Sequence, residues 1–138
     1  MQTACNGNKG QDVGQIAQFK QSERILIDAR CMAALFSRLG HRRGEAYVTG
    51  KVEAMTDLLA RIEGQYRSDR HDTIASEARQ VSRMAADIGL TSLARVARDL
   101  GIVALRKDKA ALGAVWARLV RIGDRSLEQI WEQPGLSM

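Results

Sequence analysis

A single proline, Pro134, stands almost at the C-terminal end of this 138-residue chain. Proline interrupts helices because it lacks a backbone N–H donor and its ring clashes with the preceding turn. A chain without internal proline can therefore form long helices. Aromatic residues, which favour strands, make up only 4% of the sequence, and hydrophobic residues make up 45%, enough for one compact domain. We expect an all-α fold.

Short breaks divide the apolar pattern into five predicted helices. Apolar residues recur every three or four positions, the spacing that lines one face of a helix. The predicted ranges are 28–39, about 44–67 and 72–89, followed by a fourth helix that starts at 91 and a fifth that starts at 108. The expected caps are Asp28, Asp72, Thr91 and Asp108 at helix starts, and Gly40 and Gly89 at helix ends.

Connections of two to five residues force consecutive helices to run antiparallel. We expect the four longer helices to form an antiparallel up-and-down four-helix bundle, with the short helix 28–39 covering one end. This bundle domain is predicted over 22–132, with a C-terminal tail over 133–138. Residues 1–21 are rich in Gly, Asn and Gln and are predicted to form a flexible N-terminal tail.

The basic charge balance raises the question of nucleic-acid binding. The chain has 21 Lys and Arg against 16 Asp and Glu, a net charge of +5, and an excess of cations is the usual footprint of a nucleic-acid partner. Here the cations are scattered among acids, which favours a solvated, salt-bridged helical surface. A helix-turn-helix over 83–101 would bury Arg95, at a cost of several kcal/mol for an unpaired charge. Nucleic-acid binding therefore stays as an alternative.

Several classes of protein are disfavoured by missing motifs. No stretch approaches the roughly 18 apolar residues of a membrane-spanning helix, and the N-terminus lacks the pattern of a signal peptide, so we expect a cytoplasmic protein with no membrane partner. Cys5 and Cys31 are not in a C-x-x-C or C-x-x-C-H arrangement, and no other cysteine is available to complete a zinc site with His41 and His71, so we interpret them as reduced thiols. Both histidines fall in predicted breaks, where we expect solvated side chains. No metal or cofactor is expected, and an enzyme is the least supported class.

Three stretches carry a pattern of small and apolar residues that points to a family. They are ILIDARCMAALFSRLG (25–40), TDLLARIEGQYRSDRHDTIASEARQ (56–80) and IGLTSLARVARDLG (88–101). Together they resemble the histidine-containing phosphotransfer (Hpt) domain of bacterial phosphorelays, and the resemblance extends from Ile25 to Trp131. It implies a partner in two-component signalling, either a response-regulator receiver domain or a histidine kinase.

The chain departs from this family at its reactive residue. In the family, an H-x-x-K-G motif begins ten residues before the turn glycine, and counting back from Gly89 places Arg79, Ser82 and Arg83 at its three named positions. Histidine is required because its imidazole nitrogen is nucleophilic, whereas a guanidinium stays protonated and has no such lone pair. We therefore expect no phosphotransfer at Arg79. A relay that uses His71 instead is disfavoured by its predicted position in a turn.

The phase of the third predicted helix places a candidate binding site on its outer face. Core positions Ala78, Val81 and Ala85 leave the other side to solvent. The predicted partner-binding residues are Arg79, Arg83, Ser82, Ala75 and Ala86. The two arginines would contact the acidic pocket of a receiver, and the two alanines would form a shallow apolar platform. The hypothesis is a non-catalytic pseudo-phosphotransfer adaptor; a helical scaffold that dimerises is a further alternative.

Overall fold

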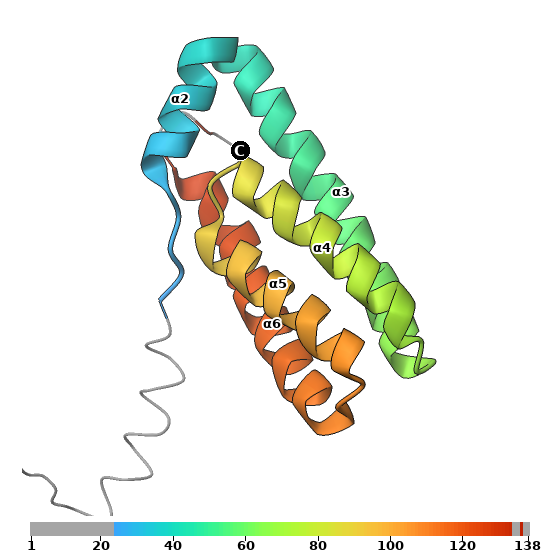
Figure 1. Cartoon of the computed structure of the whole chain (residues 1–138). Coiled ribbons are helices and arrows are strands. Elements are labelled where there is room, and N and C mark those ends of the chain that lie inside the picture. Colours follow the sequence, from blue (N-terminus) through green and yellow to red (C-terminus); the bar gives the residue numbers. More distant parts are fainter. Residues whose placement is uncertain (1–23, 134–135, 137–138) are drawn as a thin grey trace, which may run out of the picture.

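A computed structural model describes residues 24–133 and 136, and Figure 1 shows their arrangement. The described residues form five α-helices and a terminal 3₁₀ turn, which confirms the predicted all-α helical bundle. Their bounds are α2 Ala29–Leu39, α3 His41–Arg67, α4 His71–Asp87, α5 Thr91–Arg106, α6 Lys109–Gln129 and η1 Ile130–Glu132.

The four long helices run up and down, and each packs against the next along the chain (Figure 1). The first and last of them, α3 and α6, meet through large side chains. The rings of Tyr66 and Trp116 stack with their centroids 5.8 Å apart. The short helix α2 lies across the end of the bundle at which α3 begins, as predicted.

Helices α4 and α5 form the most extensive helix pair of the bundle. Small residues make this close approach possible, because they add little bulk between the two backbones. The buried small residues along this pair are Ala75, Ala78, Ala85, Ala97, Gly101 and Ala104. The relative positions of side chains on the outer faces of α4 and α5 are therefore set by direct packing of the two helices.

The chain segment before α2 pairs with the turn between α4 and α5. The backbone N–H of Asp28 donates to the carbonyl of Gly89 at 2.7 Å, and Ile27 and Leu90 form an isolated antiparallel bridge. Gly89 has a φ of +81°, and a Cβ there would lie 2.8 Å from the Asp28 carbonyl oxygen. Glycine is thus required at this turn for its conformation and for the close approach of the first segment.

Two of the four predicted N-caps are confirmed. Asp28 accepts hydrogen bonds from the N–H groups of Arg30 and Cys31, and Asp108 accepts one from Ala111. The predictions for Asp72 and Thr91 are wrong, because both residues lie inside their helices.

The reasons differ at the two helix starts. At α4, the turn ends with Asp69 at a φ of +63° and the helix already begins at His71, without a side-chain cap. At α5, the bridge to Ile27 holds Leu90 at the N-cap position, so tertiary pairing replaces a capping side chain.

The predicted start of the second helix near 44 is also wrong, since α3 begins at His41. Gly40 alone makes the corner, with a φ of +84° that glycine tolerates, and residues 41–43 continue directly into the helix. The histidines predicted in breaks, His41 and His71, are therefore the first residues of α3 and α4.

The predicted N-terminal tail, residues 1–21, lies outside the described residues. At the other end, the predicted tail 133–138 contains one residue of the core: Leu136 is buried, and its N–H donates to the carbonyl of Gln133. No helix within the described ranges is both long and apolar enough to cross a membrane.

Candidate functional site

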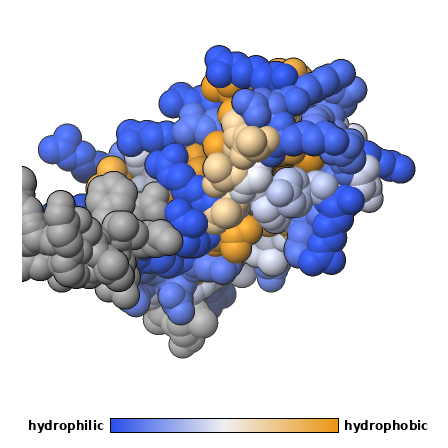
Figure 2. Space-filling model, turned by 90° about the horizontal axis from the view of Figure 1, so that it is seen from below, coloured by the Kyte–Doolittle hydropathy of each residue, from blue (hydrophilic) through white to orange (hydrophobic). Residues whose placement is uncertain are grey.

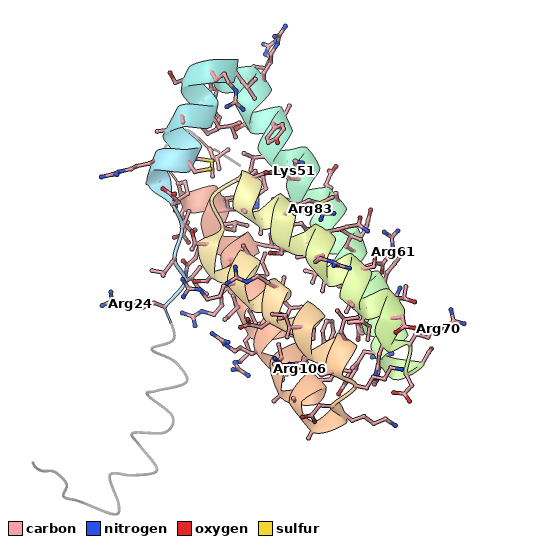
Figure 3. All side chains as sticks on the ribbon, viewed as in Figure 1. Arg24, Lys51, Arg61, Arg70, Arg83 and Arg106 are labelled. Carbon is pink, nitrogen blue, oxygen red and sulfur yellow. The ribbon has the colours of Figure 1, made fainter. Side chains whose placement is uncertain are left out.

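The outer ridge of α4 carries three of the predicted site residues on the surface. Arg79, Arg83 and Ala86 are exposed, whereas Ala78, Val81 and Ala85 are fully buried. The sequence therefore predicted the phase of this helix correctly at these positions. Figure 3 shows Arg83 on the outer side of α4, with Lys51 and Arg61 on the neighbouring α3.

Two of the predicted site residues lie elsewhere. Ala75 is only 2% exposed, because it faces α5 at the point where Gly101 lets the two helices approach, so the predicted platform of Ala75 and Ala86 does not form. Ser82 is half-buried, and its hydroxyl donates to the Ala94 carbonyl of α5 at 2.8 Å. The face of α4 that packs against α5 is therefore wider than the apolar stripe that a spacing of three and four residues predicts.

Helix α5 supplies the apolar surface that sequence analysis assigned to alanines of α4. Ile102 and Leu105 are 43% and 58% exposed, and as residues three positions apart they lie on the same face of α5 and together form a small apolar patch. With Arg79 and Arg98 they border a depression of about 110 Å³ between the two helices, whose floor is Ala75 and Gly101. We call these six residues the α4–α5 groove. In Figure 2, which views the molecule from below, a strip of hydrophobic surface lies between hydrophilic borders.

A sequence signal for the α5 half of the groove was present. Ile102 and Leu105 fall outside the apolar phase set by Leu93, Val96 and Leu100, a pattern that indicates side chains pointing away from the core. The resemblance to the Hpt family implied a binding site on α4 alone. The sequence of either helix alone could not predict that Arg79 and Arg98 border the same depression.

The arginines of this face have no acidic partner among the described residues. Within residues 24–133 and 136, neither Arg79 nor Arg98 forms an ion pair, and the same holds for Arg83 and Arg95 on either side. No carboxylate of the described part of the chain borders the groove. Several cations elsewhere are paired: Lys51 with Asp87, Arg61 with Glu77, Arg67 with Glu63, Lys109 with Asp69, and Arg118 with Asp99. The α4–α5 groove is therefore a local excess of positive charge beside apolar surface.

A second depression continues the groove toward the turn between α4 and α5. Arg98 borders both depressions, and Arg95, Cys31 and Ser82 border the second one. Burial raises the pKa of the Cys31 thiol, and the nearby acids, Asp28 first, raise it further. Because the thiolate is the nucleophilic form, this environment disfavours a reactive cysteine.

His71 lies at the end of the bundle where the α3–α4 and α5–α6 turns meet. Its Nε2 atom lies 2.9 Å from a carboxylate oxygen of Asp69, and its side chain is only 10% exposed. Lys109 contacts the second oxygen of Asp69 at 3.3 Å and is the main cause of the lowered pKa of that carboxyl. The prediction of a solvated histidine is therefore wrong for His71, whose ring contacts Asp69, whereas His41 is exposed as predicted.

No cluster of three or more His, Cys, Asp or Glu side chains suited to a metal ion occurs in the described part of the chain. Comparison of the chain with protein-family models, with characterised proteins and with solved structures gave no match.

Proposed function

We propose that this protein is an Hpt-like signalling adaptor that binds a response-regulator receiver domain without passing phosphate to or from it. The observation that carries the proposal is the position of Arg79. It is exposed on α4 at the place where the resemblance puts the phosphoacceptor histidine, and with Arg98 it borders a groove that no described carboxylate lines. The proposal includes a cytoplasmic location, where receiver domains act.

The chemistry of the α4–α5 groove suits the proposed partner. The phosphorylation pocket of a receiver is acidic, and guanidinium groups form strong, bidentate hydrogen bonds with carboxylates. Arg79 and Arg98 have no competing carboxylate among the described residues, so a partner does not need to displace one. Ile102 and Leu105 beside them offer apolar area to bury, the usual source of binding free energy in the centre of an interface.

The side chains around the groove support binding rather than phosphotransfer. The Arg79 guanidinium is permanently protonated and has no nucleophilic lone pair. The hydroxyl of Ser82 is engaged with the Ala94 carbonyl, and the raised pKa of Cys31 keeps its thiol protonated. His71 is held by Asp69 at the start of α4, eight residues before Arg79, which makes it a poor substitute for a histidine on the outer ridge.

The proposal is tested by titrating a panel of purified receiver domains against the fluorescently labelled full chain and measuring anisotropy. We expect at least one receiver to bind. The charge reversal Arg79→Glu should weaken that binding by about tenfold or more, since it replaces a charge-assisted contact by repulsion. Arg42→Glu is the matched control, because Arg42 is equally an exposed arginine but lies at the α2–α3 corner. The proposal is wrong if no receiver binds, or if both variants bind equally well.

Nucleic-acid binding is a second candidate function, because the same face carries further arginines. Arg83 and Arg95, like the two arginines of the groove, have no ion-pair partner in the described part of the chain. A protein that contacts six to ten phosphates loses about 10³-fold or more in affinity between 50 and 200 mM salt. A labelled duplex or single strand whose affinity for the chain falls that steeply would favour this function over the adaptor. The third candidate, a dimerising scaffold, predicts a concentration-dependent mass in ultracentrifugation.

A further inference from the structure

The two arginines of the α4–α5 groove lie on different helices but border the same small depression. Arg79 comes from α4 and Arg98 from α5, and the depression between them has a volume of about 110 Å³. The helices run antiparallel, and the hydrogen bond from Ser82 to Ala94 gives their register. Arg79 lies three residues before Ser82 and Arg98 lies four residues after Ala94, so both stand about one turn from this contact in the same direction.

The positions of these arginines are fixed by packing behind them. The backbone of α4 at Ala75 approaches Gly101 of α5 so closely that a Cβ on Gly101 would lie 3.5 Å from the Ala75 carbonyl oxygen. Ala78 and Ala97 are fully buried between the bundle helices. Bringing two like charges to one depression is unfavourable unless an anion compensates them, and no carboxylate among residues 24–133 and 136 borders the depression.

The number of cations indicates the charge of the ligand. A carboxylate carries one negative charge, whereas a phosphoryl group carries about 1.5 to 2 negative charges at pH 7 and three acceptor oxygens. Two guanidinium groups, each able to donate two parallel hydrogen bonds, match the phosphoryl group better in both charge and acceptor number. The apolar surroundings of Ile102 and Leu105 strengthen these contacts once water is displaced.

From this we infer that Arg79 and Arg98 form a clamp for the phosphoryl group of a phosphorylated receiver, so that the protein binds the phosphorylated receiver in preference to the unphosphorylated one. The inference rests on the proposed function and specifies its regulation. An adaptor with this preference would capture an activated receiver and, lacking a nucleophile beside the clamp, would hold it instead of relaying its phosphate.

The test compares one receiver in two states. A receiver that binds the full chain is titrated with Mg²⁺ alone and with Mg²⁺ plus beryllofluoride, which mimics the phosphoryl group on the receiver aspartate. We expect the beryllofluoride form to bind about tenfold or more tightly. Arg98→Gln and Arg79→Gln should each reduce this preference to about twofold or less. Arg42→Gln, which removes an exposed arginine at the α2–α3 corner, away from the groove, should keep it.

The outcomes separate this inference from the proposed function. Equal affinity for the two forms would overturn the phosphoryl clamp but leave receiver binding intact. A preference that persists in both glutamine variants would show that other residues bind the phosphoryl group, which also overturns the assignment of the clamp to Arg79 and Arg98. If neither form of any receiver binds the unmodified chain, the proposed function itself fails. Circular dichroism of each variant checks that the bundle is folded, as expected for exposed positions.

Discussion

Gly44 and Gly50 of α3 allow a prediction that isolates one packing contact. Both are interior to the helix, but Gly44 is buried and Gly50 is exposed. A Cβ built on Gly44 would lie 2.6 Å from Cε1 of Phe36 and closer still to Cδ1, whereas a Cβ on Gly50 would meet no atom within 4 Å. Gly44 therefore lets the Phe36 ring of α2 lie directly against the α3 backbone, and this contact holds α2 across the end of the bundle.

The expected free energies follow from these two environments. Alanine in place of glycine inside a helix stabilises it by roughly 0.5–1 kcal/mol, so Gly50→Ala should raise the free energy of unfolding by about that amount. Gly44→Ala gains the same helix propensity but forces the Phe36 ring out of its place. Overpacking of this kind costs about 1–3 kcal/mol, so the net effect should be a loss of up to about 2 kcal/mol.

Urea denaturation followed by circular dichroism measures both changes in the free energy of unfolding. The same pair of variants in a Phe36→Leu background is the control, because leucine removes the ring that a Cβ on Gly44 would meet. In that background the gap between the two variants should shrink to within about 0.5 kcal/mol. If Gly44→Ala stabilises the unmodified chain as much as Gly50→Ala does, the assigned contact between Gly44 and Phe36 does not limit the packing of α2.

Two further predictions concern the two ends of α4. Gly89→Ala should lower the free energy of unfolding by about 2–4 kcal/mol, because it places a Cβ at positive φ and 2.8 Å from the Asp28 carbonyl oxygen. This close contact also disturbs the pairing of the first segment with the α4–α5 turn. A thermal melt unchanged from that of the unmodified chain would contradict this account of the turn. Asp69 has a pKa lowered below its ordinary value of 3.8, chiefly by its hydrogen bond with Lys109 and then by the charge of Lys109 and the contact with His71. Its stabilising contribution is therefore present above pH 3.8 and is lost as the pH falls through the lower, folded-state pKa. The difference in urea midpoint between the unmodified chain and Asp69→Asn should accordingly be larger at pH 6 than at pH 2.5, and a difference independent of pH would refute the assigned contacts.

The helical content and the bundle were predictable because they depend on local chemistry. The absence of internal proline and the recurrence of apolar residues every three or four positions act within each segment, whatever its neighbours are. The same holds for the caps at Asp28 and Asp108, whose carboxylates bond to N–H groups two or three residues further on. Where a helix start depends on a distant contact, as at Leu90 with its bridge to Ile27, the local rule failed.

The α4 side of the candidate site was predictable from the sequence, but the α5 side was not, because it depends on a contact between helices. The phase of one helix showed that Arg79, Arg83 and Ala86 face solvent, because a helix has one rotation per 3.6 residues regardless of its partner. The sequence by itself could not show how wide the contact with α5 is, and therefore placed Ala75 on the surface.

What the sequence by itself determined is thus the set of amphipathic helices and the solvent-facing position of Arg79 on one of them. Only the tertiary structure decided which second helix stands beside Arg79, since that depends on the register of α4 against α5. Small residues at Ala78, Ala97 and Gly101 let the two helices approach, and the Ser82 hydroxyl contacts the Ala94 carbonyl in the resulting register. That packing brings Arg98 to the same groove, because side chains 19 positions apart in the sequence become neighbours when two antiparallel helices touch.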